Sequence, residues 1–356
     1  MNIVISTDKL ARGGKEKQLV ILASELLKRN YNVSIISAHE LDSENHFAEF
    51  KFPLEKIYTL SKSKVKNTKK LFKKTLIKLN PNVVLVWDLK SYIWAEQLKK
   101  KLKTMVIINC SIRRGVPYDS VKHRVLSWYI AKKSTFNVAN SKAGLKLYKL
   151  EENENNKVIY NALPDTPNET KANFESIFKK SKKEGDVLIA SVANLYSHKN
   201  QVSLLQAIKK LNNPKYHAVL VGDGDDKHAL QRFISENKLE KQISLMGRQN
   251  DVFPYLNAAD LYVNTSSGEG CSNALLEAIS CGLPVITTPN GGTTEITLPQ
   301  HTRFFNFNDS NELALAIKEM AHNRKLDQDE IAKWKEKFNP QVFTDEFESL
   351  IKKAIA

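Results

Sequence analysis

Two glutamates, Glu269 and Glu277, lie in and just after a short loop that contains Gly268 and Gly270, and paired carboxylates can act as acid and base or can bind a ligand. The segment 265–278 opens with small polar residues and closes with apolar residues at helical spacing, so we expect a loop that leads into a helix. Eight positions along a helix correspond to a rise of about 12 Å, whereas the paired carboxylates of a glycoside hydrolase lie about 5–9.5 Å apart. The two acids are therefore expected to contact different parts of one extended ligand.

The elements around this loop would make it an anion-binding turn. The run 260–266 before it has the β-branched and aromatic content of a buried strand. A strand, a glycine loop and a helix present free backbone N–H groups at the helix N-terminus, where the macrodipole favours an anion such as phosphate. The pair Gly13 and Gly14, between the apolar run 2–6 and a helical pattern from about residue 15, forms a second turn of this kind.

The segment 269–296, EGCSNALLEAISCGLPVITTPNGGTTEI, resembles the signature of family 4 glycosyltransferases of the GT-B fold. The resemblance covers most of the chain and is most specific over 187–295. An ordinary strand–helix turn with a surface glutamate is the alternative. The resemblance implies a retaining, nucleotide-sugar-dependent hexosyltransferase.

Alternation of apolar runs with helical patterns predicts an α/β protein with parallel sheets covered on both faces. The pattern runs through the first half of the chain and restarts at residue 187, after a polar stretch that begins with prolines. We therefore expect two doubly wound, Rossmann-like domains that face a cleft. The expected ranges are 1–165 for the acceptor, 166–335 for the nucleotide sugar, and 336–356 for a last helix that crosses back onto the first domain.

The resemblance also implies a role for individual residues. Glu277 would accept hydrogen bonds from the ribose and Glu269 would hold sugar hydroxyls, while Lys199 would neutralise charge on the leaving diphosphate; Glu269 and Lys199 are the catalytic candidates. Further donor contacts are expected from these residues: Gly13, Gly14, Gly270, Cys271, Ser272 and Asn273.

Two positions depart from the pattern of the family. Asn194 stands where many relatives have an arginine, so we expect Asn194, backbone N–H groups or Arg248 to compensate. Ser111 occupies the region where many relatives have a histidine. Arg113 is a candidate contact for an acidic or phosphorylated acceptor, and an ordinary surface arginine is the alternative.

The net charge of +15 lies entirely in the first half of the chain. Residues 1–165 contain 31 lysines and arginines against 15 acids, and residues 166–356 contain 23 against 24. The segment 62–78 holds eight lysines and no acid, interleaved with apolar residues at helical spacing. It predicts either a helix on anionic lipid, through Lys69, Lys70, Lys73 and Lys74, or a sheet-covering helix with a solvated lysine face.

Composition narrows the class of protein further. Three widely spaced cysteines indicate a reducing compartment without a disulfide framework or a zinc site. No apolar run approaches the roughly 18 residues of a membrane span, and the N-terminus lacks the pattern of a signal peptide. We expect a cytoplasmic protein, with peripheral attachment to the inner face of the cytoplasmic membrane as an extension of that prediction.

The resulting hypothesis is transfer of a sugar from a nucleotide sugar, with UDP expected, to a glycan acceptor. A lipid-linked acceptor in cell-surface polysaccharide, lipopolysaccharide or glycoconjugate synthesis suits the basic first half. No cofactor or metal is expected, because no Asp-x-Asp pair is placed to bridge phosphates. A nucleotide-sugar epimerase of the same fold is the alternative. A nucleic-acid-binding protein is a weaker one, since no aromatic-rich basic motif accompanies the charge.

Overall fold

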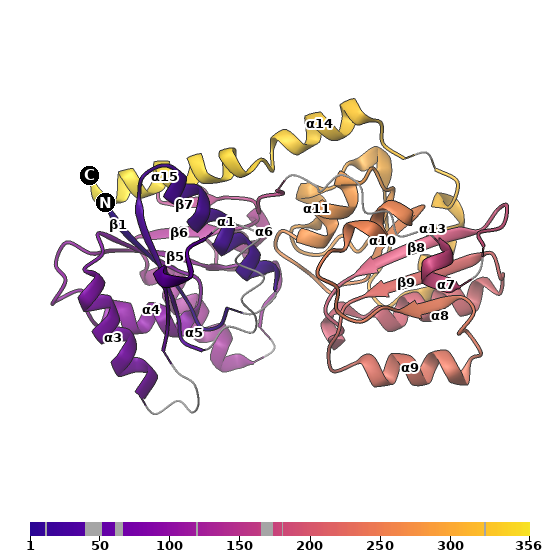
Figure 1. Ribbon diagram of the computed structural model, residues 1–356, viewed down its shortest axis with the longest axis horizontal. Coiled ribbons are helices and arrows are strands. Elements are labelled where there is room, and N and C mark those ends of the chain that lie inside the picture. Colours follow the sequence, from indigo (N-terminus) through magenta and orange to yellow (C-terminus); the bar gives the residue numbers. More distant parts are fainter. Residues whose placement is uncertain are drawn as a thin grey trace. The chain divides into compact units, whose positions relative to one another are not determined.

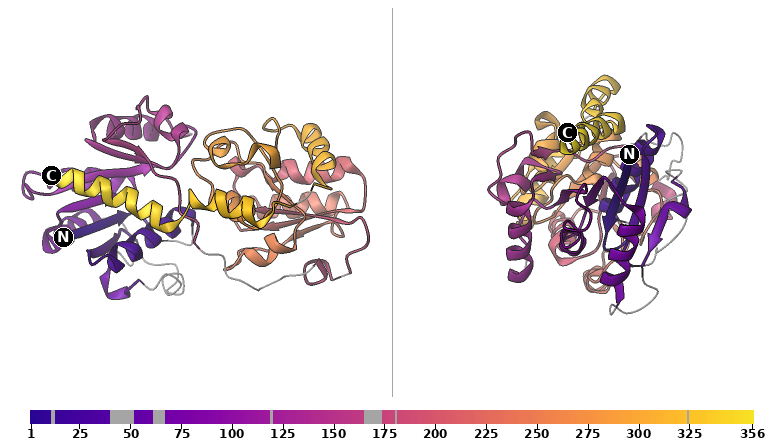
Figure 2. Two further views of the ribbon diagram at one scale, coloured as in Figure 1. Left: turned by 90° about the horizontal axis from the view of Figure 1, so that it is seen from above. Right: turned by 90° about the vertical axis from the view of Figure 1, so that its left-hand side faces the viewer.

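The computed structural model describes residues 1–10, 13–39, 52–60, 67–118, 120–164, 174–179, 181–323 and 325–356. The chain divides into two compact units, and each is described here by itself (Figures 1 and 2). Unit 1 comprises Met1–Ala162 and Phe338–Ala356, and unit 2 comprises Leu163–Lys337. None of the described helices combines the length and the apolar composition needed to traverse a bilayer.

The described part of unit 1 contains a sheet of seven parallel strands in the order β3-β2-β1-β4-β5-β6-β7. Its central strands are almost entirely buried, and the strand Val83–Val86 is fully apolar, as expected for a parallel sheet that is covered on both faces. The strands are β1 (Asn2–Thr7), β2 (Asn32–Ser37), β3 (Ile57–Thr59), β4 (Val83–Val86), β5 (Val106–Ile112), β6 (Phe136–Ala139) and β7 (Asn156–Val158).

Two helical layers cover this sheet. One face packs against α1 (Gly14–Lys28) and α15 (Pro340–Ile355). The other face packs against α3 (Thr68–Leu79), α4 (Leu89–Glu96) and α5 (Val121–Lys133), which share one core cluster and lie side by side (Figure 1). The short helix α6 (Lys142–Leu147) follows β6.

The structure places the predicted basic helix on the second layer. Phe72 and Leu76 of α3 are fully buried against the sheet, while Lys69, Lys70 and Lys74 are exposed. The helix therefore covers the sheet and presents lysines to solvent, and contact of these lysines with lipid remains a prediction. Residues 62–66 of the predicted segment lie outside the described residues.

The described part of unit 2 contains a sheet of six parallel strands in the order β10-β9-β8-β11-β12-β13. The strands are β8 (Val187–Val192), β9 (Tyr216–Val221), β10 (Ile243–Leu245), β11 (Leu261–Asn264), β12 (Val285–Thr287) and β13 (Thr302–Phe304). The helices are α7 (Phe174–Phe178), α8 (Gln201–Leu211), α9 (Lys227–Glu236), α10 (Phe253–Ala258), α11 (Asn273–Ser280), α12 (Thr293–Ile296), α13 (Ser310–Met320) and α14 (Gln328–Glu336). Both sheets have the strand order of doubly wound α/β domains, so the predicted fold class is confirmed.

The helix α15 begins after a break at Asn339, whose side chain caps it and is followed by a proline at the first helical position. It belongs to unit 1 and packs along α1 (Figure 2). Arg29, the C-cap residue of α1, lies 2.6 Å from carboxylate oxygens of both Asp345 and Glu348. Hydrogen bonds from Lys352, Arg29 and Tyr31 lower the pKa of Glu348 to about 2.

Candidate functional site

The candidate site lies at the carboxyl edge of the unit 2 sheet, between β8 and β11. The order of the strands reverses at this point, and ligands of doubly wound domains bind beyond the carboxyl ends of the strands at such a reversal. The loop after β8 carries Lys199 and the loop after β11 carries Glu269. The topology therefore brings together two loops that are 70 residues apart in the sequence.

Hydrogen bonds hold these two loops against each other. The Thr265 hydroxyl donates to the Lys199 carbonyl at 2.7 Å, and the Ser267 N–H donates to the His198 carbonyl at 2.8 Å. The backbone that carries Lys199 is thus fixed from the opposite loop. The sequence alone does not predict these two hydrogen bonds, because a hydroxyl residue in a loop gives no indication of the group to which it will bind.

The side chains of Lys199 and Glu269 form an ion pair. Lys199 Nζ lies 2.8 Å from Glu269 Oε1, with 17% and 15% of the respective side chains exposed. The Ser266 hydroxyl lies 2.7 Å from the same oxygen. Burial opposes the charged form of Glu269, but the Lys199 charge and hydrogen bonds from Lys199, Ser266 and Ser272 outweigh it and hold the pKa of Glu269 below its usual range. The site therefore holds a carboxylate and an ammonium group that are both largely removed from water.

The backbone of Glu269 is held by the loop after β12. The Gly292 N–H donates to the Glu269 carbonyl at 2.8 Å, and Gly291 forms a parallel bridge with Glu269. Gly291 has a φ of +66°, and a Cβ atom built there would lie 2.1 Å from the Glu269 carbonyl oxygen. Position 291 therefore requires glycine, both because its backbone is left-handed and because the Glu269 carbonyl leaves no room for a Cβ atom.

The start of α11 lies directly after the ion pair. Gly270, Cys271 and Ser272 are buried, and Ser272 occupies the N-cap position without a side-chain hydrogen bond to the first turn. The first N–H groups of a helix need partners from outside the helix, so this end can take an anion. Asn273, the first residue of α11, is partly exposed there.

Glu277 lies in the second turn of α11 and is 7% exposed. Burial first, and then the charges of Glu269 and Glu277, raise the pKa of the Tyr262 phenol on β11. The Tyr262 hydroxyl donates to the Val192 carbonyl at 3.2 Å and so ties β11 to the end of β8 beneath the site. Tyr262 was missed by sequence reasoning, where it counted only as an apolar strand residue.

The positions expected to compensate for the missing arginine lie on different loops. Asn194 follows β8 and is exposed, and its carbonyl accepts a hydrogen bond from the Gln201 side chain at 3.0 Å. Arg248 is exposed after β10, which β9 separates from β8. The pKa of Asp223 is lowered mainly by a hydrogen bond from the Gly224 N–H, and the charge of Arg248 adds to this shift. Compensation by Asn194 or Arg248 remains a prediction.

In unit 1, the predicted glycine turn is occupied by a side chain of the chain itself. Gly13 is the N-cap of α1, and a Cβ atom built there would lie 2.4 Å from Oε2 of Glu16. Glu16 is the third residue of the helix, from which a glutamate can fold back over the N-terminus. The glycine pair therefore makes room for this carboxylate, and contact of Gly13 and Gly14 with a donor remains a prediction.

Arg113 makes contacts within unit 1 that favour a structural role. Its guanidinium carbon lies 3.8 Å from the ring centroid of Trp87, at the end of β4. Nη1 donates to the Asn161 side chain at 2.9 Å, and Nε donates to the Cys110 carbonyl at 3.3 Å. The side chain thus links the ends of β4 and β5 to the segment after β7. Arg113 is half-buried and held by unit 1, and contact of Arg113 with an acceptor remains a prediction.

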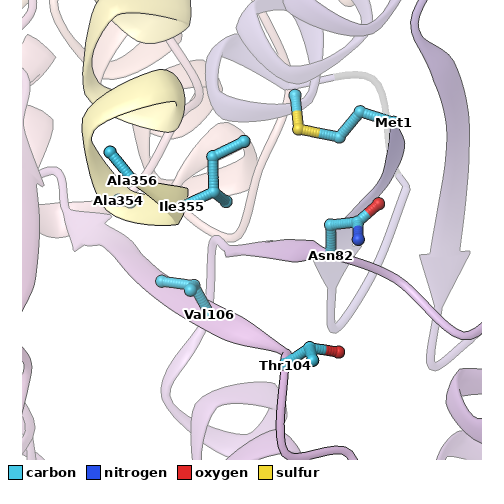
Figure 3. Close-up of a pocket in the computed structure, with 7 residues that line it drawn as sticks. All are labelled: Met1, Asn82, Thr104, Val106, Ala354, Ile355 and Ala356. Atoms are coloured by element: carbon cyan, nitrogen blue, oxygen red, sulfur yellow. The ribbon is translucent and has the colours of Figure 1, made fainter.

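An open pocket in unit 1 lies at the amino-terminal edge of its sheet (Figure 3). It is lined at the amino-terminal ends of β1, β4 and β5 and by the last residues of the chain: Met1, Asn82, Thr104, Val106, Ala354, Ile355 and Ala356. No charged side chain lines it. In the described part of the chain, no three His, Cys, Asp or Glu side chains converge as metal ligands would.

Comparisons with known proteins agree with this geometry. The family "Glycosyl transferases group 1" matches residues 173–337, which contain the whole unit 2 site. An uncharacterized glycosyltransferase of Haemophilus influenzae is 25% identical over 293 residues, which are 77% of this chain and 76% of that protein. The N-acetylgalactosamine-N,N'-diacetylbacillosaminyl-diphospho-undecaprenol 4-alpha-N-acetylgalactosaminyltransferase of Campylobacter jejuni is 29% identical over 196 residues, so the match spans about half of each protein (52% and 51%).

Among solved structures, Anabaena Alr3699/HepE in complex with UDP-glucose has a TM-score of 0.82. The comparison covers 99% of this chain and 100% of that one at 18% sequence identity, and at that identity it establishes the fold. Residues 173–337 therefore match the model of the group 1 glycosyl transferases, and the likeness to the solved structure shows that the two units have the GT-B fold.

Proposed function

We propose that this chain is a retaining glycosyltransferase that moves a sugar from a UDP-sugar to a glycan acceptor, in the synthesis of a cell-surface polysaccharide, lipopolysaccharide or glycoconjugate. The observation that carries the proposal is the Lys199–Glu269 pair, which lies before the start of α11 within the family-matching segment. The name of the Anabaena structure, a complex with UDP-glucose, supports UDP as the nucleotide.

The diphosphate of the donor would lie at the start of α11 and compete with Glu269 for the Lys199 ammonium group. Arrival of the phosphates would weaken the ion pair of the free chain, and the released carboxylate would accept hydrogen bonds from sugar hydroxyls. As the bond to the sugar breaks, negative charge grows on the leaving phosphate oxygen. An ammonium group that the opposite loop already holds in place stabilises that charge without reorganisation.

Glu277 would accept hydrogen bonds from the ribose hydroxyls. The two acids would act on separate parts of the donor, since Glu269 precedes α11 and Glu277 lies in its second turn. No general base is assigned. We propose that the leaving phosphate oxygen takes the acceptor proton on the same face of the sugar, so that the anomeric configuration is retained. Lys199 and the start of α11 would supply the positive charge that a divalent cation supplies elsewhere.

The acceptor is proposed to be lipid-linked. The name of the Campylobacter relative contains an undecaprenol diphosphate, a glycan carrier that resides in a membrane. The exposed lysines of α3 provide a surface of the sign that anionic lipid attracts. Attachment of the chain to the inner face of the cytoplasmic membrane would bring it to such an acceptor.

Incubation with a panel of UDP-sugars and polyprenyl-diphosphate glycans, in buffer with EDTA, tests the proposal. We expect UDP release, a glycan lengthened by one sugar, and an α-linkage by proton NMR from an α-linked donor. Lys199→Ala should lower turnover by a factor of about 100 to 1000, the usual effect of removing one such group. Appearance of a new UDP-sugar without transfer would instead identify an epimerase. Absence of both products would contradict the proposal.

A further inference from the structure

The helix α5 carries four large apolar side chains that the fold leaves in solvent. Val121, Val125, Trp128 and Tyr129 are 64%, 61%, 49% and 52% exposed. They occupy positions i, i+4, i+7 and i+8, which at 3.6 residues per turn lie within an arc of roughly 100°. The buried residues Ser127, Ile130 and Ala131 lie on the opposite side of the helix, against the sheet. One side of α5 therefore packs on the core, while Val121, Val125, Trp128 and Tyr129 on the opposite side are exposed in the described structure. We call these four residues the α5 apolar face.

Basic residues border the α5 apolar face. Lys122 and Lys133 flank it on one side and Arg124 on the other, and all three are exposed. The helix contains no aspartate or glutamate. Lysine and arginine stems can lie along an apolar surface while their charged ends reach toward polar or anionic groups. Tryptophan and tyrosine are the side chains most enriched where a membrane meets water.

The helix α3 adds five lysines and no acid to this layer, whereas the single lysine of α4 is balanced by Glu96. The three helices α3, α4 and α5 pack side by side on the same face of the unit 1 sheet (Figure 1). Glu96 is the sole acid within the three helices, and it pairs with Lys99 at 3.1 Å and Lys133 at 3.7 Å. The exposed side of this layer therefore combines an apolar strip with an almost uncompensated positive surface.

We propose that the α5 apolar face inserts into the headgroup region of an anionic membrane, with the lysines of α3 contacting lipid phosphates on the same layer. An interfacial helix buries its apolar side about 5–10 Å into the headgroup and acyl boundary, and attraction to anionic lipid adds to that burial. The sign of the charge selects this occupant over an uncharged partner. The inference extends the proposed lipid-linked acceptor by assigning the surface that docks, and its test does not require sugar transfer.

The test compares binding of the full chain to phosphatidylcholine vesicles with and without phosphatidylglycerol, by sedimentation at low and high salt. The central variant is Val125→Ser/Trp128→Ser, which leaves every charge in place. The matched control is Leu315→Ser/Val342→Ser, two apolar side chains on α13 and α15 that are 57% and 43% exposed. Charge reversal at Lys70 and Lys74 of α3 separates the electrostatic contribution.

We expect wild type to bind anionic vesicles and to retain part of that binding at high salt. The α5 variant should partition about tenfold less, because two half-exposed side chains no longer leave water, whereas the control should bind as wild type does. Charge reversal on α3 should remove the salt-sensitive part of the binding. Brominated lipids should quench Trp128, the tryptophan with the largest exposed fraction in the described chain.

Three results would overturn the inference. They are no binding of wild type to anionic vesicles, equal binding of wild type and the α5 variant, and a wild-type dimer in ultracentrifugation that the α5 variant dissolves. The last result would assign the α5 apolar face to a second copy of the chain. UDP binding by calorimetry is measured on the same samples. A chain that binds UDP but not vesicles would refute the docking surface alone, and one that binds vesicles but no nucleotide would refute the proposed function alone.

Discussion

Replacement of Lys199 by methionine should destabilise the chain by stranding the Glu269 carboxylate. Two unit charges at the observed 2.8 Å attract each other by about 6 kcal/mol at an effective dielectric constant of about 20. Removing one member of a buried pair costs about 3–5 kcal/mol. Because 15% of the Glu269 side chain is exposed and Ser266 still contacts it, we expect the lower end, about 3 kcal/mol.

The double variant Lys199→Met/Glu269→Gln should lose less stability than the single variant. With no charge left, only the hydrogen bonds and the packing of the pair change, and a loss of about 1 kcal/mol is expected. For a unit of this size, 1 kcal/mol corresponds to a melting shift of about 2–4 °C. The single variant should therefore melt about 6–12 °C lower than wild type in calorimetry, and the double variant about 2–4 °C lower.

The pH dependence of stability gives an independent check, because the charge of Lys199 lowers a Glu269 pKa that burial alone would raise. In wild type the pKa of Glu269 is lowered, so its contribution to the free energy of unfolding is present above the usual range and is lost as the pH falls through the lowered pKa. Without Lys199, burial alone would raise this pKa, and protonation of Glu269 would restore part of the stability that the single variant has lost. The gap between wild type and Lys199→Met should narrow from pH 7 to about pH 4.5. Equal losses in the single and double variants, or a gap that does not change with pH, would refute the reasoning.

Further predictions concern the close approach at Gly291, the structural arginine and the last helix. Gly291→Ala should destabilise the chain and abolish a nucleotide-induced melting shift. Gly247 has the same φ of +66° but nothing within 4 Å of an added Cβ, so Gly247→Ala should lower the free energy of unfolding by only about 1 kcal/mol. Equal effects of the two substitutions would contradict the close-approach argument. Arg113→Lys should lower the free energy of unfolding by about 1–2 kcal/mol through loss of the stack on Trp87 without changing the KM for acceptor, and a change in KM alone would restore an acceptor role. The lowered pKa of Glu348 means that its pairing is complete above the usual carboxylate range and is lost as the pH falls toward about 2; the hydrogen-exchange protection factors of α15 should decrease over that window in wild type and decrease less in Glu348→Gln.

The central strands and the site loop could be predicted because their signals are local. The apolar runs at 2–6, 83–87 and 187–194 are long enough to show burial on both faces. The edge strands β7 and β13 are only partly buried and contain polar residues, so nothing in their sequences separates them from loops. For them, pairing with a neighbouring strand decides the structure.

The contacts within the site depend on positions far apart in the sequence. The segment around Glu269 is recognisable from its residues, but its pairing with Lys199 follows from the order of the strands. The backbone contact of Gly291 with Glu269 has the same origin. The stacking of Arg113 on Trp87 has the same origin, because β4 and β5 are neighbours in the sheet. The ligand contact predicted from the place of Arg113 after a parallel strand stays a prediction.

The most direct test of donor binding at the unit 2 site is the melting temperature with UDP, GDP, ADP and CMP. Ligand at about 100 times its dissociation constant adds about 2.7 kcal/mol of stability, or about 5–10 °C for a unit of this size. The proteins to compare are wild type, Glu277→Ala and Glu336→Ala, an exposed glutamate on α14 of the same unit. We predict a shift with UDP that persists in Glu336→Ala and disappears in Glu277→Ala. No shift with any nucleotide, or an undiminished shift in Glu277→Ala, would contradict the assignment of the donor site.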